Sequence, residues 1–330
     1  MNIAVIGGGA WGTTLASLLA GKGYPTRLWV REAALAEEIQ KKGENTWFLP
    51  GVSLAPGLEC GSDLRSVCRE AELFLCVVPC QYLREILKQC LEFLPVKPLV
   101  ICASKGIELE RLKPMSEVVQ EELTALDPEF AVLSGPSFAG EVGRGLPTAV
   151  ALGCADRSTG ARLQQVLSST SFRVYFNPDY RGVELGGALK NVMAIAVGIS
   201  DGLGFGDDAR AALITRGLAE ISKLGCRLGA RERTFMGLSG LGDLVLTCTG
   251  DLSRNRQVGL RIGRGESLYQ ILNGMQMVAE GVKTAEAVYR LGRRLGVDTP
   301  ITDQVYAMLF SDKEPAQAVQ ELMQRELKEE

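Results

Sequence analysis

Proton transfer in this chain must proceed without histidine, because none of its 330 residues is a histidine. A Ser-His-Asp or Cys-His mechanism and a histidine-ligated metal are therefore excluded, and we predict no metal site. The strongest candidate for moving a proton is Lys190, which lies inside the apolar segment 183–200. Burial of an unpaired ammonium is costly and favours the neutral amine, which can act as a general base for an alcohol that loses hydride. The alternative is a lysine whose ammonium reaches the surface from one edge of the helix.

The first dozen residues carry a dinucleotide-binding pattern. An apolar run over 1–6 leads into a G-x-G-x-x-G turn formed by Gly7, Gly9 and Gly12, and a helical pattern follows from Thr13. In this order the first glycine permits a tight turn, the second lets the backbone approach a pyrophosphate, and the third lets helix and strand pack closely. The alternative is a glycine-rich turn without a ligand. The residues predicted to bind the cofactor here are Gly7, Gly9, Ala10, Trp11 and Gly12.

Two basic residues follow predicted strands and should lie at the same sheet edge as this turn. Arg31 comes after the strand 25–30, where an arginine can accommodate the 2′-phosphate of NADP. Glu32 follows directly, so NADP is favoured without excluding NAD, and a solvated charge is an equal alternative. Lys105 follows the strand 98–103, in a position suited to an anionic substrate, although surface lysines are common.

A further cluster of polar side chains suits a phosphate group. Ser253, Arg254, Asn255 and Arg256 offer a hydroxyl, an amide and two guanidinium groups within one predicted loop. Guanidinium groups bind phosphate in a bidentate manner. A solvated basic turn is the local alternative, but the coincidence with a dinucleotide site and a candidate base favours phosphate binding. A second polar loop is predicted at 240–243.

The composition indicates a globular, soluble protein. Hydrophobic residues make up 46% of the chain, charged residues 23%, and the formal net charge is -3, which gives no reason to expect a nucleic-acid partner. No apolar run reaches the ~18 residues of a membrane span, so we expect no stable membrane insertion. Met1 leads straight into an apolar strand without a signal-peptide pattern, and we expect a cytoplasmic protein. Nine cysteines without a C-x-x-C pair predict reduced, mostly buried thiols, with Cys76 and Cys102 in the core.

The elements that position these residues change character along the chain. Val- and Ile-rich runs typical of buried parallel strands alternate with helical segments until about residue 178, and long helical patterns follow. We therefore predict an α/β protein with an N-terminal Rossmann-type doubly wound sheet in 1–178. A mainly α-helical substrate-binding and catalytic domain should occupy 179–330, with the active site in the cleft between them.

Several motifs together resemble the bacterial NAD(P)-dependent glycerol-3-phosphate dehydrogenases essentially from end to end. They occur in the order typical of that family. The shared motifs are Gly7 to Gly12, Lys105-Gly106, Gly135 to Ala139, the Glu184 to Asn191 helix, Gly204 to Asp207, Gly240 to Leu244, Ser253 to Arg256 and Val278 to Gly281.

The resemblance implies an oxidoreductase that interconverts sn-glycerol 3-phosphate and dihydroxyacetone phosphate by hydride transfer with NADP or NAD. Such an enzyme supplies glycerol 3-phosphate for glycerophospholipid synthesis, and the resemblance is compatible with a homodimer. By the same likeness Lys190 is the proton acceptor, Lys105 polarises the substrate and Asp243 positions Lys190. The implied substrate-binding residues are Lys105, Gly135, Ser137, Lys190, Asp243, Ser253, Arg254 and Asn255. The implied cofactor residues are Trp11, Arg31, Phe48, Lys105, Ala139, Arg254, Val278 and Glu280.

Three departures from the family pattern concern its site regions. The family commonly has Tyr where this chain has Phe48, Ser or Thr where it has Cys80, and Asn-Ala-Lys where it has Asp208-Ala209-Arg210. Phe48 lacks a hydroxyl contact, so the resemblance supports its cofactor role less than it supports the others. None of the three departures removes an implied catalytic group.

Two other functions compete with this interpretation. One is a related two-domain dehydrogenase that acts on a sugar acid or keto acid, such as a 6-phosphogluconate or ketopantoate enzyme, which substrate screening distinguishes. The other is a non-catalytic regulator that senses the ratio of NADPH to NADP. Such a regulator has no need of a buried lysine and a phosphate-binding loop, and a turnover assay distinguishes it.

Overall fold

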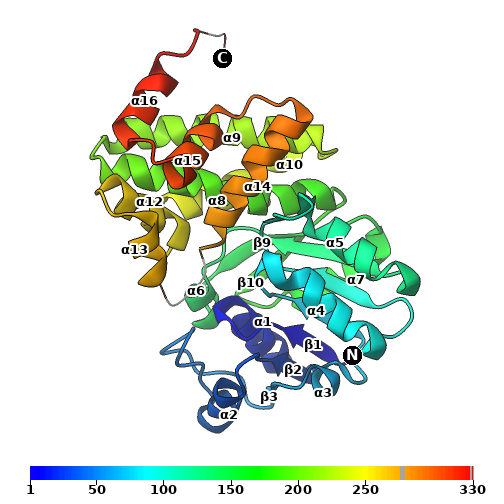
Figure 1. The fold of residues 1–330 in the computed structure, drawn as a ribbon. Coiled ribbons are helices and arrows are strands. Elements are labelled where there is room, and N and C mark those ends of the chain that lie inside the picture. The colour runs from blue at the N-terminus through cyan, green and yellow to red at the C-terminus, as the bar shows by residue number, and fades with distance from the viewer. Residues whose placement is uncertain (276–278, 328, 330) are drawn as a thin grey trace. The chain divides into compact units, whose positions relative to one another are not determined.

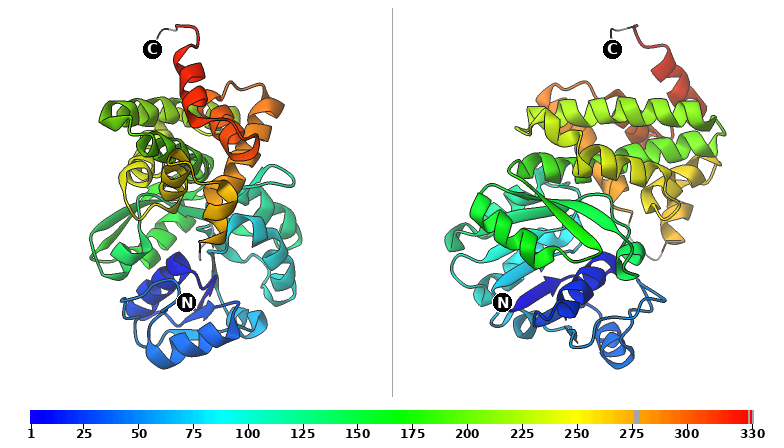
Figure 2. Two further views of the ribbon diagram at one scale, coloured as in Figure 1. Left: turned by 60° about the vertical axis from the view of Figure 1, so that its left-hand side comes forward. Right: turned by 180° about the vertical axis from the view of Figure 1, so that it is seen from behind.

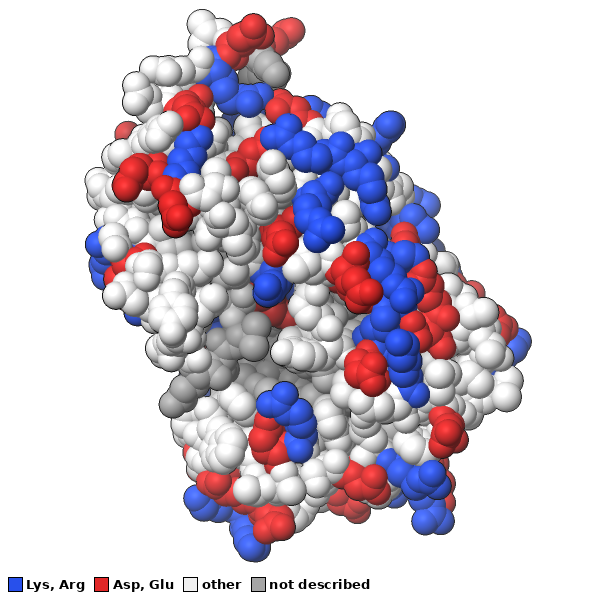
Figure 3. Space-filling view, in the orientation of Figure 1, with Lys and Arg blue, Asp and Glu red and all other residues white. Residues whose placement is uncertain are grey.

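The computed structural model describes residues 1–275, 279–327 and 329, and it divides into two compact units. Unit 1 comprises Met1–Lys105 and Lys113–Glu184, and unit 2 comprises Gly106–Leu112 and Leu185–Glu330. In Figures 1 and 2 the strands of the main sheet run from blue to green, whereas the chain beyond residue 185 is helical. On the face drawn in Figure 3, basic and acidic side chains are interspersed.

Unit 1 is built on an eight-stranded sheet with the order β10-β9-β8-β5-β4-β1-β2-β3. Neighbouring strands pair in parallel except β8 with β9, which are antiparallel. The order from β3 to β5 reverses between β1 and β4, as in doubly wound nucleotide-binding folds, and confirms the predicted Rossmann-type sheet. The strands are β1 (Ile3–Ile6), β2 (Thr26–Trp29), β3 (Glu59–Gly61), β4 (Leu73–Cys76), β5 (Leu99–Cys102), β8 (Glu129–Ser134), β9 (Thr148–Cys154) and β10 (Phe172–Asn177).

Helices cover both faces of this sheet. Ile3 and Val5 of β1 belong to one buried cluster and Ala4 and Ile6 to another, as the two-residue period of a strand requires. The first cluster includes side chains of α1 (Ala10–Gly21), α2 (Ala33–Lys42) and α7 (Arg157–Leu167). The second includes side chains of α3 (Leu64–Cys68), α4 (Leu83–Cys90) and α5 (Met115–Glu122). The remaining short elements of unit 1 are η1 (Cys80–Tyr82), η2 (Leu91–Phe93), β7 (Lys113–Pro114), η3 (Thr124–Leu126) and α6 (Ala139–Gly143).

The predicted burial of the thiols is confirmed. Seven of the nine cysteines are buried, Cys60 is half-buried and Cys226 is exposed, and none of the nine forms a disulfide. Cys76 and Cys102 are register partners across β4 and β5 in the core. Burial raises the pKa of Cys76 to about 12, so this thiol stays protonated at neutral pH.

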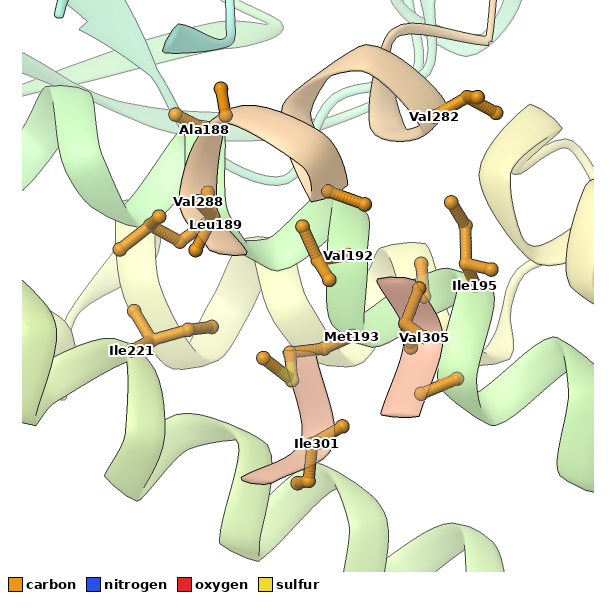
Figure 4. Close-up of a cluster of buried hydrophobic side chains, with 14 of the residues drawn as sticks. Ala188, Leu189, Val192, Met193, Ile195, Ile221, Val282, Val288, Ile301 and Val305 are labelled. Carbon is orange, nitrogen blue, oxygen red and sulfur yellow. The ribbon is translucent and has the colours of Figure 1, made fainter. Parts of the chain in front are cut away.

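Unit 2 is organised around α8 (Tyr180–Gly202), which begins in unit 1 and continues as the central helix of unit 2. Its side chains, including Leu189, Val192 and Met193, pack against Ile221 and Val288 of other helices (Figure 4). The helix is long and apolar enough to cross a membrane, but its apolar stretch is wholly buried inside the protein, as in a core helix. The other elements of unit 2 are β6 (Ile107–Glu108), α9 (Gly206–Arg227), α10 (Glu232–Phe235), the π-helical turn η4 (Leu238–Gly242), α11 (Asp243–Thr249), α12 (Arg254–Gly263), α13 (Leu268–Asn273), α14 (Glu280–Leu295), α15 (Pro300–Phe310) and α16 (Pro315–Met323).

The two segments predicted as polar loops in the second half differ in outcome. The prediction for 240–243 is wrong because this segment is helical, whereas in 250–256 only residues 254–256 are helical. The segment 240–243 forms the end of η4 and the start of α11, and Ser253 is the N-cap of α12. Glycine made the first segment resemble a loop, but here it permits close packing. A Cβ at Gly240 would lie 2.0 Å from the carbonyl oxygen of Phe235. Glycine is therefore needed for a backbone contact inside a helical region.

Candidate active site

The glycine turn of unit 1 has the geometry expected of a pyrophosphate-binding loop. Gly7 has φ +132°, and a Cβ there would lie 2.7 Å from the carbonyl oxygen of Val77. A Cβ at Gly12 would lie only 1.9 Å from the carbonyl oxygen of Gly7, so helix and strand pack through this position. At Gly9 a Cβ would meet no atom of the described residues within 4 Å. Gly9 is also the N-cap of α1, so open space for an anion lies beside the helix N-terminus.

The side chain of Asn45, which is not among the predicted site residues, stabilises this turn. Its side chain is fully buried, and its Nδ2 donates to the carbonyl oxygen of Gly8 at 2.9 Å and to Oγ1 of Thr13 at 2.8 Å. Its Oδ1 accepts a hydrogen bond from the backbone nitrogen of Phe48 at 3.1 Å. One amide therefore joins the glycine turn to the segment that carries Phe48. In the sequence this asparagine lies just before two aromatic residues, and the pattern there indicates only a hydrophobic loop.

Three other predicted cofactor residues of unit 1 lie in α1, just after β2 and at the start of α6. Ala139 begins α6, and its carbonyl oxygen accepts a hydrogen bond of 3.1 Å from Thr14 of α1. Trp11 is half-buried in α1, and its indole Nε1 has no hydrogen-bond partner among the described residues. Arg31 is exposed just after β2, and its Nε donates to Glu32 at 2.8 Å. An exposed ion pair of this kind contributes only about 0–1 kcal/mol, so it costs little to exchange Glu32 for another anion.

Three predicted substrate residues of unit 1 meet at one carbonyl oxygen. Nζ of Lys105 donates to the carbonyl oxygen of Gly135 at 3.3 Å, and Oγ of Ser137 donates to the same oxygen at 3.1 Å. Gly135 has φ +142°, and a Cβ there would lie 2.9 Å from the Cα of Val150. The turn after β8 thus requires glycine, and it brings a cation and a hydroxyl together.

Lys190 is buried in an ion pair in unit 2. Its Nζ donates to Oδ1 of Asp243 at 2.6 Å and to Oγ1 of Thr247, and the two charged side chains are only 8% and 2% exposed. Thr247 in turn donates to the backbone carbonyl oxygen of Asp243 at 2.6 Å. The lysine therefore does not extend to the surface. Thr247 was not predicted, since its contribution depends on the single helical turn that separates it from Asp243 in α11.

The predicted phosphate cluster divides into two parts in the structure. Oγ of Ser253 caps α12 by accepting from the backbone nitrogen of Arg256. Oδ1 of Asn255 accepts from the backbone nitrogen of Gly281 at 3.0 Å, so its Nδ2 is the side-chain group with donors for a ligand. The guanidinium of Arg256 is held by two aspartates, and its predicted phosphate contact is therefore replaced by a structural one. Arg254 is exposed in the first turn of α12.

The two remaining predicted cofactor residues lie close together in the sequence. Glu280 is half-buried and begins α14, next to the Gly281 nitrogen that Asn255 binds. Val278 lies outside the described residues.

A doubly wound sheet that carries a glycine turn of this geometry is typical of NAD(P)-binding proteins, and a buried lysine–carboxylate pair in the helical unit suits an oxidoreductase among them. The family model described as NAD-dependent glycerol-3-phosphate dehydrogenase N-terminus matches residues 2–160, and the C-terminus model matches 179–320. The chain belongs to the NAD-dependent glycerol-3-phosphate dehydrogenase family.

Individual members of the family match along the whole chain. The chain is 59% identical over 330 residues to a glycerol-3-phosphate dehydrogenase [NAD(P)+] of Solidesulfovibrio magneticus, covering 100% of both proteins. It is 58% identical over 330 residues to the enzyme of the same name from Nitratidesulfovibrio vulgaris, again covering 100% of both. The crystal structure of a glycerol-3-phosphate dehydrogenase from Coxiella burnetii has a TM-score of 0.94 and 40% identity, covering 98% of this chain and 99% of that one.

Proposed function

We propose that this enzyme reversibly interconverts sn-glycerol 3-phosphate and dihydroxyacetone phosphate with NADP or NAD, and so supplies glycerol 3-phosphate for glycerophospholipid synthesis. The observation that carries the proposal is the buried Lys190–Asp243 pair in a chain of this family. Residues 1–178 would bind the cofactor, and 179–330 would bind the substrate and carry the proton-transfer residue.

The residues of unit 1 suit a dinucleotide. The open space at Gly9 and the N-terminus of α1 would receive the pyrophosphate, and Phe48 and Ala139 would border the nucleotide. Arg31 would bind a 2′-phosphate where NADP is used. When bound, the nicotinamide supplies the hydride acceptor or donor.

Side chains of this protein would transfer the proton and stabilise the charge that develops in the reaction. When the ketone is reduced, the ammonium of Lys190 would donate the proton that the substrate oxygen gains. The neutral amine that results would take the hydroxyl proton back when the alcohol is oxidised. Asp243 and Thr247 fix the position of Nζ in Lys190 through their hydrogen bonds. Lys105 would polarise the substrate oxygen, because an ammonium stabilises developing negative charge.

The phosphate of the substrate would be bound at the N-terminus of α12. Arg254 supplies a guanidinium in the first turn, and Nδ2 of Asn255 and the hydroxyl of Ser253 supply further donors. Gly135 and Ser137 of unit 1 are also proposed to bind the substrate.

A turnover assay tests the proposal directly. The protein is mixed with NADPH and dihydroxyacetone phosphate, and we expect the absorbance of the reduced cofactor to fall. Ketopantoate and 6-phosphogluconate, assayed in the direction that each allows, should give no comparable rate. Absence of turnover with dihydroxyacetone phosphate under both NADPH and NADH would refute the proposed reaction, and turnover with another substrate alone would identify the competing dehydrogenase.

We also propose that the enzyme works in the cytoplasm and forms a homodimer, with no nucleic-acid partner and no stable membrane insertion. Size-exclusion chromatography with light scattering should give about twice the mass of one 35.5 kDa chain. A mass equal to that of one chain at micromolar concentration would contradict the dimer.

A further inference from the structure

Helices α8 and α12 touch through their backbones, at two glycines on each helix. A Cβ at Gly198 would lie 2.1 Å from the carbonyl oxygen of Arg256, and one at Gly202 would lie 2.5 Å from that of Leu260. The contact is reciprocal, because Cβ atoms at Gly259 and Gly263 would lie 2.1 and 2.4 Å from carbonyl oxygens of α8. Such spacing leaves no room for sliding or rotation without a clash. The helix that carries Lys190 and the helix that begins at Arg254 therefore have a fixed crossing.

A buried carboxylate reinforces this crossing at the end of α8. Oδ2 of Asp201 accepts from Nε of Arg256 at 2.9 Å and lies 2.8 Å from its Nη2. Oδ1 accepts from Nε of Arg210 at 3.0 Å and lies 2.9 Å from its Nη2. The Asp201 side chain is 5% exposed and that of Arg256 is 11% exposed. Each carboxylate oxygen thus holds one guanidinium through two nitrogens, an arrangement that fixes geometry as well as charge.

A carboxylate at the position of Asp201 is electrostatically unfavourable unless cations such as these two arginines are paired with it. It is the penultimate residue of α8, and the negative end of the helix dipole disfavours a carboxylate there. Arg210 contacts Oδ1 of Asp201 with two nitrogens. Arg256 is also fixed on its other side, because its Nη1 donates to Asp251 at 2.9 Å. Arg256, the third residue of α12, therefore fixes the first turn of this helix.

We propose that Asp201 is a positioning residue for substrate binding, which acts through Arg256 on the first turn of α12. This inference rests on the proposed function, in which Arg254 and Asn255 bind the substrate phosphate. Asp201 lies 11 residues after Lys190 on the same helix, roughly 16 Å along its axis at 1.5 Å per residue. Through the glycine crossing and the Asp201–Arg256 pair, α8 sets both where the proton is transferred and where the phosphate is bound.

The test uses Asp201→Asn, which keeps the shape of the side chain and removes its charge. We expect the KM for dihydroxyacetone phosphate to rise about tenfold or more, while kcat changes less than threefold and the KM for NADPH stays within twofold. The matched control is Arg210→Gln, which removes the partner of the other carboxylate oxygen and leaves the Asp201–Arg256 pair in place. Its KM for dihydroxyacetone phosphate should stay within twofold of the wild type.

A double variant shows whether the effect passes through Arg256. Asp201→Asn combined with Arg256→Gln should have the same substrate KM as Arg256→Gln alone. Additive effects, or an unchanged KM in Asp201→Asn, would overturn the proposal. If Asp201→Asn fails to fold, Arg256→Lys and Arg256→Gln take its place, with a graded rise in KM expected from lysine to glutamine and an unchanged KM overturning the proposal.

Hydrogen exchange separates failure of this inference from failure of the proposed function. Amides of 254–258 should exchange faster in Asp201→Asn than in the wild type or in Arg210→Gln, while amides of 285–292 in α14 stay protected in all three. This result does not depend on turnover. If the wild type did not reduce dihydroxyacetone phosphate, the proposed function would fail and exchange alone would decide the role of Asp201; equal exchange in all three proteins would refute it.

Discussion

The glycine turns of unit 1 are defined by backbone contacts, whereas the buried Lys190 of unit 2 is held in place by other side chains. Gly7, Gly12 and Gly135 each occupy a place where a Cβ would collide with backbone atoms of the same unit. In unit 2 the position of Lys190 depends instead on hydrogen bonds with the side chains of Asp243 and Thr247. The difference implies that an added methyl group should damage the first kind of site, and that removal of a charge should damage the second.

The largest effect is expected from Lys190→Met. This substitution removes the proposed proton-transfer group, and general acid–base catalysis of this kind contributes roughly 10²–10⁴-fold. We therefore expect kcat to fall about a thousandfold. NADPH binding, followed by fluorescence titration, should stay within a factor of three because the proposed cofactor residues around the glycine turn are untouched.

A second substitution separates catalysis from stability in this variant. Loss of Lys190 leaves the carboxylate of Asp243 buried without its cation, which typically costs about 3–5 kcal/mol. Adding Asp243→Asn should restore much of the thermal stability but none of the activity. Wild-type activity in Lys190→Met would show that another group transfers the proton.

The next largest effect is expected on stability, and it distinguishes two alanine substitutions in the glycine turn. Gly12→Ala would place a Cβ 1.9 Å from a backbone oxygen, a clash that no side-chain rotation relieves, and should cost roughly 3 kcal/mol of stability or more. Gly9→Ala meets no described atom within 4 Å, so the protein should unfold at nearly the wild-type temperature. Its methyl group projects where the pyrophosphate is proposed to bind, and KM for NADPH should rise. Equal stabilities of the two variants would contradict the proposed difference between these glycines.

The same difference explains how much could be predicted from the sequence. The glycine spacing after an apolar strand is a local signal, and it predicted both the Rossmann-type sheet and the turn around Gly7. Burial of Lys190 was also inferred, because the surrounding helix is apolar. The partners of Asn45, Asp201 and Thr247 could not be inferred in this way, since each depends on contacts or helical geometry that residue types alone do not reveal. Arg256 was misassigned for the same reason, because its partner Asp201 lies 55 residues away.

Glu184 is an exception in unit 1, because its contacts are made by its side chain. Its burial predicts that the free energy of unfolding depends on pH. Its carboxylate accepts hydrogen bonds from the backbone nitrogen and Oγ of Ser116, at 2.7 and 2.6 Å, and so caps the start of α5. Burial raises the pKa of Glu184 from an ordinary 4.5 to about 7, although both hydrogen bonds oppose the shift. Between these values the folded protein keeps a proton that the unfolded chain releases. The free energy of unfolding should therefore fall as the pH rises through this window, by up to about 3 kcal/mol.

Glu184→Gln removes this titration and should flatten the dependence. Urea unfolding at pH 5 and pH 7.5 measures the pH dependence of the free energy of unfolding. We expect the variant to be more stable relative to the wild type at pH 7.5 than at pH 5. Glu117→Gln is the matched control, since it removes the nearby negative charge that also raises the pKa of Glu184 but leaves the buried carboxyl in place. An unchanged slope in Glu184→Gln would exclude Glu184 as its source.

The smallest expected effect concerns Arg31, the one exposed side chain of unit 1 to which we assign a specific cofactor contact. A hydrogen bond to a charged group contributes about 1.5–3 kcal/mol, so Arg31→Ala should raise the KM for NADPH about tenfold or somewhat more. The KM for NADH should stay within twofold, because that cofactor lacks the 2′-phosphate. Glu32→Gln is the matched control: it removes the present partner of Arg31 and should lower the KM for NADPH slightly. Because the site is exposed, the advantage of NADPH should shrink as salt is added. If neither substitution changed the ratio of the KM values for NADPH and NADH, the choice of cofactor would be assigned to the backbone of unit 1. Arg31 would then no longer be an exception to the difference between the two units.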